Sequence, residues 1–518
     1  MRAAWIGVFR QKHIEHIVEA RAALPADRRI PVRRVGRAGQ LDFYADHFAE
    51  WPRVNHVGTS QLTYQSLDDA VELTQLVEAA RTLDAYVSPE RKRRWIDGCF
   101  KPDAALLQAS FQTIHNIACW CRSAEVQVAL YSGDNALWTQ AVEGPNGIRE
   151  QVARGVTSDY LWFEQSLGYN AYVVQALLPC FTNAMRAGRG RRSLRAEMET
   201  VENLMLTPAA MRFPDGHLPN PADSNAIHHA PDRELLARAA NLFPTAIGLR
   251  QLAGEKSWTA LLASSNTAPE AAPLPEVTSR NLESTRMAIL RHGPWQVFFH
   301  YGQLTASHAQ AEALNFEAAF GTTDVSHDPG TVGYGSPMSR DYYRAGVCHN
   351  VPLVDGAGQE GWDPGKLERF ASQSVSASQP RYRTHAEAAR RLEVLGDLLR
   401  DTESISVTDG TTHALGFMLN LQGKIHFAAP LAADLSFPDS RPAGFRYFRD
   451  ATRADFRDQA IFTVDCSGTR FRVTLQLPGA FTLWHVSAPD GPPNRREAVY
   501  LETRGTAATL TTTFTPLR

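Results

Sequence analysis

The sequence predicts a multidomain α+β protein, with an N-terminal helical domain followed by an antiparallel β domain. In residues 67–86, apolar residues recur three and four positions apart, which is the period of an amphipathic helix. After residues 264–279, which are rich in Pro, Ala and Ser, the chain changes to apolar runs separated by Gly-containing turns, the pattern of strands. Because the helical segments follow one another without intervening strands, we expect them to pack on each other.

The length of 518 residues exceeds what one hydrophobic core usually supports, so two or three domains are expected. The change of pattern predicts a helical domain at residues 1–262, a linker at 263–279 and a β domain at 280–518. Further helices are predicted in residues 105–131, 147–154, 169–185, 194–204 and 233–252. Hairpins or strands are predicted in residues 287–302, 404–421 and 460–477 and near the C-terminus.

Charge and composition exclude some partners. With 53 Lys and Arg against 55 Asp and Glu, the net charge of −2 gives no electrostatic argument for nucleic acid or an anionic membrane. No apolar run approaches the roughly 18 residues that span a bilayer. The first 24 residues resemble an amphipathic helix and not a secretory signal. The location stays open between the cytoplasm and, if a signal has been removed, the periplasm or the outside of the cell; the oligomeric state is not predicted. The six cysteines are expected to be reduced and mostly buried.

Residues 298–362 carry the densest polar chemistry of the chain, with His300, His308, His327 and His349 among turn glycines. Histidine is the side chain best suited to proton transfer near neutral pH. One such histidine is more often structural than catalytic, but four within this stretch indicate a site.

A second polar patch, residues 155–172, falls in the helical part. Trp162 is either a sugar-stacking platform or a core aromatic. Tyr169 and Tyr172 are three positions apart, so they share one helix face.

These two patches, in this order, resemble the heparinase II/III family of polysaccharide lyases. Residues 159–172, DYLWFEQSLGYNAY, are similar to the family element D-G-x-W-x-E-x-S-x-x-Y-H-x-Y. Residues 307–312, SHAQAE, stand where the family has x-H-G-H-x-D; the elements beginning at Asp328 (DPGT) and His349 (HN) follow in order. The resemblance implies an incomplete (α/α) toroid joined to stacked antiparallel sheets.

The resemblance also implies a β-elimination. A base removes the C5 proton of a uronate, an acid protonates the O4 leaving group, and a neutraliser stabilises the charge that spreads onto the carboxylate. By motif position Tyr169 is the acid, and for one C5 stereochemistry also the base, while His308 is the partner base. Asn116 is the expected neutraliser, with His115 as the second candidate.

The expected partner is an acidic polysaccharide, either a glycosaminoglycan such as hyaluronan, chondroitin or heparan sulfate, or alginate. Arg340 and Arg344 are expected to meet substrate carboxylate or sulfate in bidentate fashion. The other expected substrate-binding residues are Glu164, Trp162, Tyr172 and Tyr334.

Many family members hold a structural zinc ion, and the resemblance implies that Asp328 and His349 are two of its ligands in this chain. Gln310 takes the place of the remaining ligand His, and Gln is a poor zinc ligand. Glu312 or His327 are the candidates to replace it, and an empty, hydrogen-bonded site is the alternative.

Two other functions remain open at this point. A glycoside hydrolase needs two carboxylates that face one bond, for which Glu164 and Asp159 are the candidates. A non-catalytic carbohydrate-binding protein is suggested by the loss of a ligand at Gln310. A lyase is distinguished from both by an unsaturated uronate product that absorbs ultraviolet light.

Overall fold

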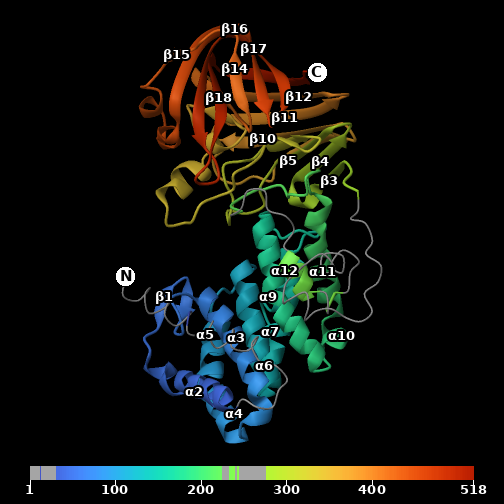
Figure 1. The fold of residues 1–518 in the computed structure, drawn as a ribbon, viewed down its shortest axis with the longest axis vertical. Helices are drawn as coiled ribbons and strands as arrows, with labels where there is room; N and C mark the ends of the chain where they lie inside the picture. The colour runs from blue at the N-terminus through green and yellow to red at the C-terminus, as the bar shows by residue number, and fades with distance from the viewer. Residues whose placement is uncertain (1–11, 13–30, 225–232, 240–241, 244–275, 518) are drawn as a thin grey trace. The chain divides into compact units, whose positions relative to one another are not determined.

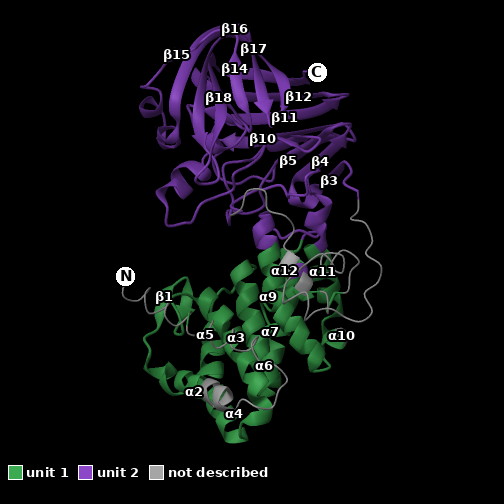
Figure 2. Cartoon of the chain, in the orientation of Figure 1, with its two compact units in different colours: residues 1–156, 171–205, 238–245 green, residues 157–170, 206–237, 246–518 purple. Residues whose placement is uncertain are grey.

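The computed structural model describes residue 12 and residues 31–224, 233–239, 242–243 and 276–517. The chain forms two compact units, which are not contiguous in sequence (Figure 2). Unit 1 contains residues 1–156, 171–205 and 238–245, and unit 2 contains residues 157–170, 206–237 and 246–518. The predicted N-terminal amphipathic helix and residues 263–275 of the predicted linker lie outside the described residues.

The described N-terminal region is helical, as predicted (Figure 1). A small antiparallel pair, β1 (Val54–His56) and β2 (Gly58–Ser60), accompanies the helices. The helices are α2 (Pro31–His47), α3 (Ser66–Leu83), α4 (Pro89–Trp95), α5 (Lys101–Ala109), α6 (Asn116–Ser132), α7 (Asn135–Glu143), α8 (Ile148–Gly155), α9 (Leu167–Arg186), α10 (Gly190–Ser193), α11 (Arg195–Leu206) and α12 (Arg233–Ala239).

The prediction of one helix over residues 105–131 is wrong, because the chain breaks between α5 and α6. Phe111 adopts a φ of 50°, which interrupts the helical path. His115 then caps α6, since its Nδ1 accepts a hydrogen bond from the Ile117 amide at 3.1 Å. The helix ends at Gly133, whose φ of 74° is the left-handed conformation that glycine adopts at little cost.

Helix α6 is the buried centre of unit 1. Apolar and polar residues on all its faces are buried, because α3, α5, α7 and α8 contact it. An all-round buried helix lacks a strong amphipathic pattern, which explains why periodicity alone did not find its start.

A pair of carboxyl groups lies inside unit 1. Asp69 accepts hydrogen bonds from the backbone amides of Gln61 (2.6 Å) and Thr63 (2.6 Å). Asp103 is fully buried, and its pKa is raised well above the usual range by burial and by the negative charge of Asp69. The raised pKa favours the protonated form of Asp103.

Unit 2 is built on antiparallel sheets. The smaller sheet has the order β3-β4-β5-β6-β7, and the larger has the path β8-β13-β18-β17-β19-β12-β11-β10-β9, with β16 on β17 and β14 and β15 on β16. Their strands are β3 (Arg280–Leu282), β4 (Met287–His292), β5 (Trp295–His300), β6 (Asn315–Phe320), β7 (Thr323–Ser326), β8 (Pro352–Val354), β9 (Lys366–Ala371), β10 (Ser374–Arg383), β11 (Ala386–Leu395), β12 (Leu398–Val407), β13 (His413–Leu421), β14 (Lys424–Phe427), β15 (Ala432–Ala433), β16 (Arg449–Cys466), β17 (Thr469–Pro489), β18 (Arg495–Gly505) and β19 (Ala507–Pro516). The predicted succession of a helical region and an antiparallel β domain is thereby confirmed.

The smaller sheet is buried on both faces. Side chains of successive strand residues alternate between the faces. On β5, Trp295, Val297 and Phe299 pack into the core shared with the larger sheet. Phe298 points the other way, into a cluster with Leu161 and Met211. The sheet therefore holds residues 157–170 and the start of residues 206–224 against its second face.

Polar side chains fix these same two segments to the sheet. Gln165 donates to the carbonyls of Thr285 (2.7 Å) and Gly302 (2.9 Å). Glu317 of β6 accepts from the Asn220 amide at 2.7 Å, and Glu312 accepts from the Ala222 amide at 2.7 Å. Buried acceptors that pair with backbone amides in this way avoid the cost of unsatisfied polar groups.

The expectation of buried, reduced cysteines is confirmed, since all six lie in the described part of the chain, are buried and form no disulfide there. A search of the described helices finds none with the length and hydropathy needed to cross a membrane.

We predict that Asp103→Asn reduces the pH dependence of unfolding of unit 1. A carboxyl whose folded pKa is raised contributes stability that is present below its unfolded pKa near 3.8 and is lost as pH rises towards the folded pKa. Between pH 5 and pH 8 the free energy of unfolding should fall less in the variant than in the wild type. A difference of about 1 kcal/mol at pH 8 corresponds to a melting temperature that is higher in the variant by roughly 2–4 °C. The melting temperature at each pH is measured by following the helical circular dichroism signal as the protein is heated.

The control is Asp97→Asn, because Asp97 is exposed in the adjacent turn of helix. Glu125, whose pKa burial raises to about 8, titrates equally in all three proteins and cancels in the comparison. Equal pH slopes in the wild type and Asp103→Asn would contradict the assignment of a neutral Asp103.

Candidate active site

Four side chains from separate segments of unit 2 meet at one point. Tyr169 lies in the first turn of α9, and His308 lies in the loop between β5 and β6. Asp223 lies in the segment that Glu312 and Glu317 hold, and Tyr334 lies in the loop after β7. The helical and the β patch of the sequence are thus brought together.

Asp223 holds the imidazole of His308. Oδ2 of Asp223 lies 2.9 Å from Nδ1 of His308, and the Asp223 amide donates to the His308 carbonyl at 3.2 Å. Because a carboxylate only accepts hydrogen bonds, Nδ1 carries the hydrogen and Nε2 is the nitrogen with the lone pair. His308 adopts a φ of 60°, a conformation that is costly for this residue type and that occurs preferentially at functional sites.

Tyr169 stacks on this imidazole, with ring centroids 3.5 Å apart and an interplanar angle of 21°. Burial raises the pKa of Tyr169 to about 12, and the negative charges of Asp223 and Glu164 act in the same direction. At neutral pH the phenol of Tyr169 is therefore protonated, and it lies beside the imidazole whose Nδ1 is held by Asp223.

Tyr334 connects the groups. Its hydroxyl donates to Oδ2 of Asp223 at 2.5 Å and lies 2.9 Å from the hydroxyl of Tyr169 and 3.2 Å from Nδ1 of His308. The residue is nevertheless 60% exposed, so its ring faces solvent while its hydroxyl is held. Burial of the hydroxyl and the adjacent Asp223 raise its pKa above the usual range.

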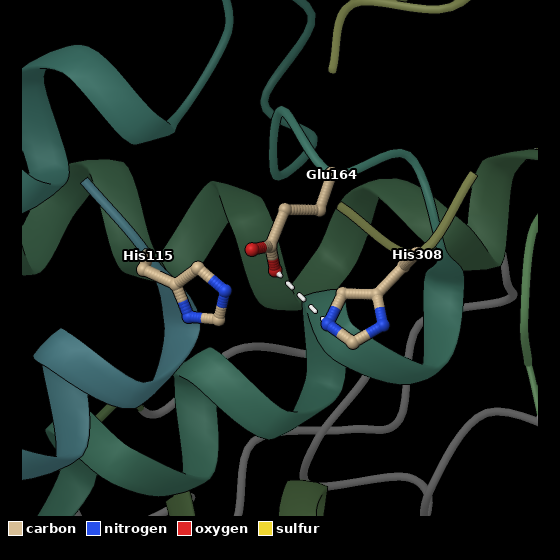
Figure 3. Close-up of side chains that lie close together, drawn as sticks. All are labelled: His115, Glu164 and His308. Carbon is tan, nitrogen blue, oxygen red and sulfur yellow. Dashed lines mark ion pairs between the residues drawn. The ribbon is translucent and has the colours of Figure 1, made fainter. Parts of the chain in front are cut away.

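Glu164 lies on the other side of His308, where its Oε2 is 3.9 Å from Nε2 (Figure 3). The indole N–H of Trp162 donates to Oε2 at 2.8 Å, and the Ser307 hydroxyl donates to Oε1 at 3.0 Å. Trp162 itself is only 1% exposed. Of the two alternatives for Trp162, its burial supports the core aromatic, and its indole N–H positions Glu164.

The predicted neutraliser and its alternative lie in unit 1. Asn116 is the buried first residue of α6, and His115 is the residue that caps this helix. Gln151 of α8 fixes the turn before them, since it accepts from the His115 amide at 3.1 Å and donates to the Thr113 carbonyl at 2.7 Å. Tyr172, also in unit 1, packs on Trp120 with ring centroids 5.1 Å apart.

The two predicted substrate-binding arginines differ in their surroundings. The side chain of Arg340 is 87% exposed and pairs with Asp341 at 3.0 Å. Arg344 is half-buried and donates to the Ala309 carbonyl at 3.0 Å. Arg344 therefore helps to hold the loop that carries His308, and its contact with substrate stays a prediction.

The predicted metal ligands form a second, fully buried cluster. Ligand atoms of Glu312, Asp328 and His349 lie within 4.8 Å of one another. Nδ1 of His349 is 2.6 Å from Asp328, whereas Nε2 of His349 and Oε2 of Glu312 are buried without a hydrogen-bond partner. Gln310 donates to the Gly330 carbonyl at 3.1 Å, and its Oε1 is likewise buried without a partner.

Of the two substitutes considered for the missing ligand, Glu312 lies in this cluster. His327 does not, because its ring nitrogens contact Asp324 at 2.5 Å and Asp490 at 3.1 Å.

Asp223 is the site residue that sequence reasoning missed. It lies 85 positions before His308, in a stretch with no periodic pattern. The available signal was local: residues 217–224, HLPNPADS, place an amide, a carboxyl and a hydroxyl among prolines, a composition that favours a fixed loop over a helix or strand.

Comparisons with known proteins identify a similar family and a similar fold. Residues 275–516 match the family model described as Heparinase II/III-like, C-terminal. No curated protein sequence matches the chain. A crystal structure of heparinase III gives a TM-score of 0.69 at 13% identity, over 98% of this chain and 77% of that chain.

Two further solved structures are similar. A heparan sulfate lyase HepC mutant from Pedobacter heparinus gives a TM-score of 0.64 at 14% identity, over 98% of this chain and 76% of that one. The Streptomyces coelicolor chondroitin AC lyase in complex with chondroitin sulphate gives 0.53 at 12% identity, over 98% and 74%. These likenesses show a shared fold, and with the match of residues 275–516 to the family model they confirm the expected resemblance to the heparinase II/III-like polysaccharide lyases.

Proposed function

We propose that the protein is a polysaccharide lyase that cleaves a uronic-acid-containing polysaccharide by β-elimination and leaves a 4,5-unsaturated uronate. The observation that carries the proposal is the stack of Tyr169 on His308, with Nδ1 of His308 held by Asp223. The names of the similar structures, heparinase III, heparan sulfate lyase and chondroitin AC lyase, support it.

In the proposed reaction His308 and Tyr169 divide the proton transfers. Nε2 of His308 takes the C5 proton, because Asp223 keeps the hydrogen of the neutral ring on Nδ1 and stabilises the imidazolium that forms. Tyr169 donates its proton to the O4 leaving group, since its raised pKa of about 12 keeps the phenol protonated. Asn116, or His115 beside it, neutralises the substrate carboxylate.

The proposed substrates are glycosaminoglycans (hyaluronan, chondroitin or heparan sulfate) or alginate. The exposed Arg340 and the exposed ring of Tyr334 are the proposed contacts for substrate. The hydrolase alternative loses support, because Asp159, one of its two candidate carboxylates, accepts from the Ser284 hydroxyl at 2.5 Å and the Thr285 amide at 3.2 Å.

We predict that one of these polymers gives rising ultraviolet absorbance with the purified protein. Tyr169→Phe keeps the stacked ring and removes the acid, and His308→Ala removes the base; each should lower kcat by about 10²-fold or more. Absorbance and reducing ends are measured together on hyaluronan, chondroitin sulfate, heparan sulfate and alginate. New reducing ends without absorbance would identify a hydrolase, and neither signal on any polymer would sink the enzyme proposal.

A second prediction concerns Asp223→Asn. An amide can donate to Nδ1 and so favour the tautomer whose Nε2 carries the hydrogen, which is the wrong one for a base. We expect kcat to fall by roughly 10²–10⁴-fold with KM little changed, as for other carboxylates that orient a catalytic His. Asp397→Asn, an exposed position in the turn between β11 and β12, is the control. Activity within twofold of the wild type would show that Asp223 does not set the state of His308.

We also propose one structural divalent metal, Zn²⁺ being the expected ion, at Glu312, Asp328 and His349. The unpartnered Nε2 of His349 and Oε2 of Glu312 fit a cation, since buried polar atoms otherwise find partners. A His with two carboxylates is an acceptable zinc donor set, and its oxygens also suit Ca²⁺. When bound, the ion links the β5–β6 loop to the loops that carry Asp328 and His349.

For this site we expect protein treated with chelator to regain about one equivalent of metal on addition of Zn²⁺ or Ca²⁺. The bound metal should then raise the free energy of unfolding by about 2.7 kcal/mol when the free metal concentration is a hundred times Kd. Glu312→Gln should lose this gain, whereas Glu317→Gln, which changes a buried carboxyl outside the cluster, should keep it. Absence of bound metal and of any thermal shift in the wild type would rule the ion out.

A further inference from the structure

We propose that Tyr334 is a proton relay that returns the active site to its starting state after each elimination. The inference rests on the proposed lyase function and adds a residue to it. It concerns the state after the C4–O4 bond is broken, when His308 carries one proton more than at the start and Tyr169 carries one fewer.

The reaction itself creates the need for a relay. When the C5–H bond breaks, its proton goes to Nε2 of His308 and its electron pair forms the C4–C5 double bond. The C4–O4 bond breaks, and O4 takes the phenolic proton of Tyr169. The products leave an imidazolium and a phenolate stacked with centroids 3.5 Å apart, an ion pair that does not start a second turnover.

The hydroxyl of Tyr334 is placed to join these two ions. It lies 3.2 Å from Nδ1 of His308 and 2.9 Å from the hydroxyl of Tyr169, both within hydrogen-bond distance. Its 2.5 Å bond to Asp223 fixes it at this position, although the ring is 60% exposed. Glu164 is less suited to be the proton relay. Trp162 and Ser307 already donate to its two oxygens, and it lies 3.9 Å from Nε2 of His308.

The relay balances in protons. His308 gives its Nδ1 proton to the oxygen of Tyr334, while Tyr334 gives its own hydroxyl proton to the phenolate of Tyr169. Both tyrosines are then neutral phenols, and His308 is neutral with the substrate-derived proton on Nε2. Exchange with water after product release restores the Nδ1–H tautomer, which Asp223 favours because only that tautomer donates to its carboxylate.

The test is rapid-mixing absorbance with Tyr334→Phe, with enzyme and polymer sites at comparable concentration. The variant keeps the ring and loses only the hydroxyl. We expect a burst in the variant: the first equivalent of unsaturated product forms faster than the following steady state by about tenfold or more, whereas the wild type shows no such difference. Added imidazole buffer, a small proton carrier, should accelerate the steady state of the variant and leave the wild type unchanged.

Tyr447→Phe is the matched control, because it removes a hydroxyl of unit 2 whose partner is Arg446 and not a site residue. A steady state of Tyr334→Phe equal to wild type would overturn the relay. So would a first turnover slowed as much as the steady state with no response to imidazole, since that pattern indicates a positioning or binding role. A wild type that yields no unsaturated product on any polymer would instead refute the lyase proposal.

Discussion

The hydrogen bond between Asp223 and Nδ1 of His308 is the interaction on which the candidate site depends. It joins residues 85 positions apart and determines which nitrogen of the ring can take a proton. Tyr169 stacks on the ring that this bond orients, and Tyr334 donates to the same carboxylate oxygen. The positions of the His308 ring, the Tyr169 phenol and the Tyr334 hydroxyl therefore all depend on Asp223.

The position of Asp223 is set in turn by the smaller sheet of unit 2. Its segment has no regular secondary structure, so its backbone amides need acceptors from elsewhere. Glu317 and Glu312 supply them at 2.7 Å each, and both belong to β6 or to the turn that enters it. Because this sheet packs on both faces, its strands have little freedom to shift, and they transfer that rigidity to the loop. Glu312 also belongs to the buried cluster with Asp328 and His349, so one side chain serves both places.

Periodicity was sufficient to predict the helical region and the antiparallel β domain, because both signals are local. Motif order was sufficient to select Tyr169 and His308, whose rings the structure brings into contact. The break at residues 110–115 was missed, since α6 is buried on all sides and has no amphipathic stripe. Asp223 was missed for a different reason: its role exists only through tertiary contacts, and the neighbouring sequence HLPNPADS indicates a fixed loop without indicating the partners of that loop.

The asymmetry around His308 decides how the site can work. Asp223 is within hydrogen-bond distance of Nδ1 at 2.9 Å, whereas Glu164 is 3.9 Å from Nε2 and already accepts from Trp162. Nδ1 is thus held, whereas Nε2, which carries the lone pair, faces a carboxylate beyond hydrogen-bond distance. A β-elimination removes one proton and delivers one, so the site must begin with one unprotonated base and one protonated acid. The held imidazole and the phenol with a raised pKa meet that condition together, and neither group meets it alone.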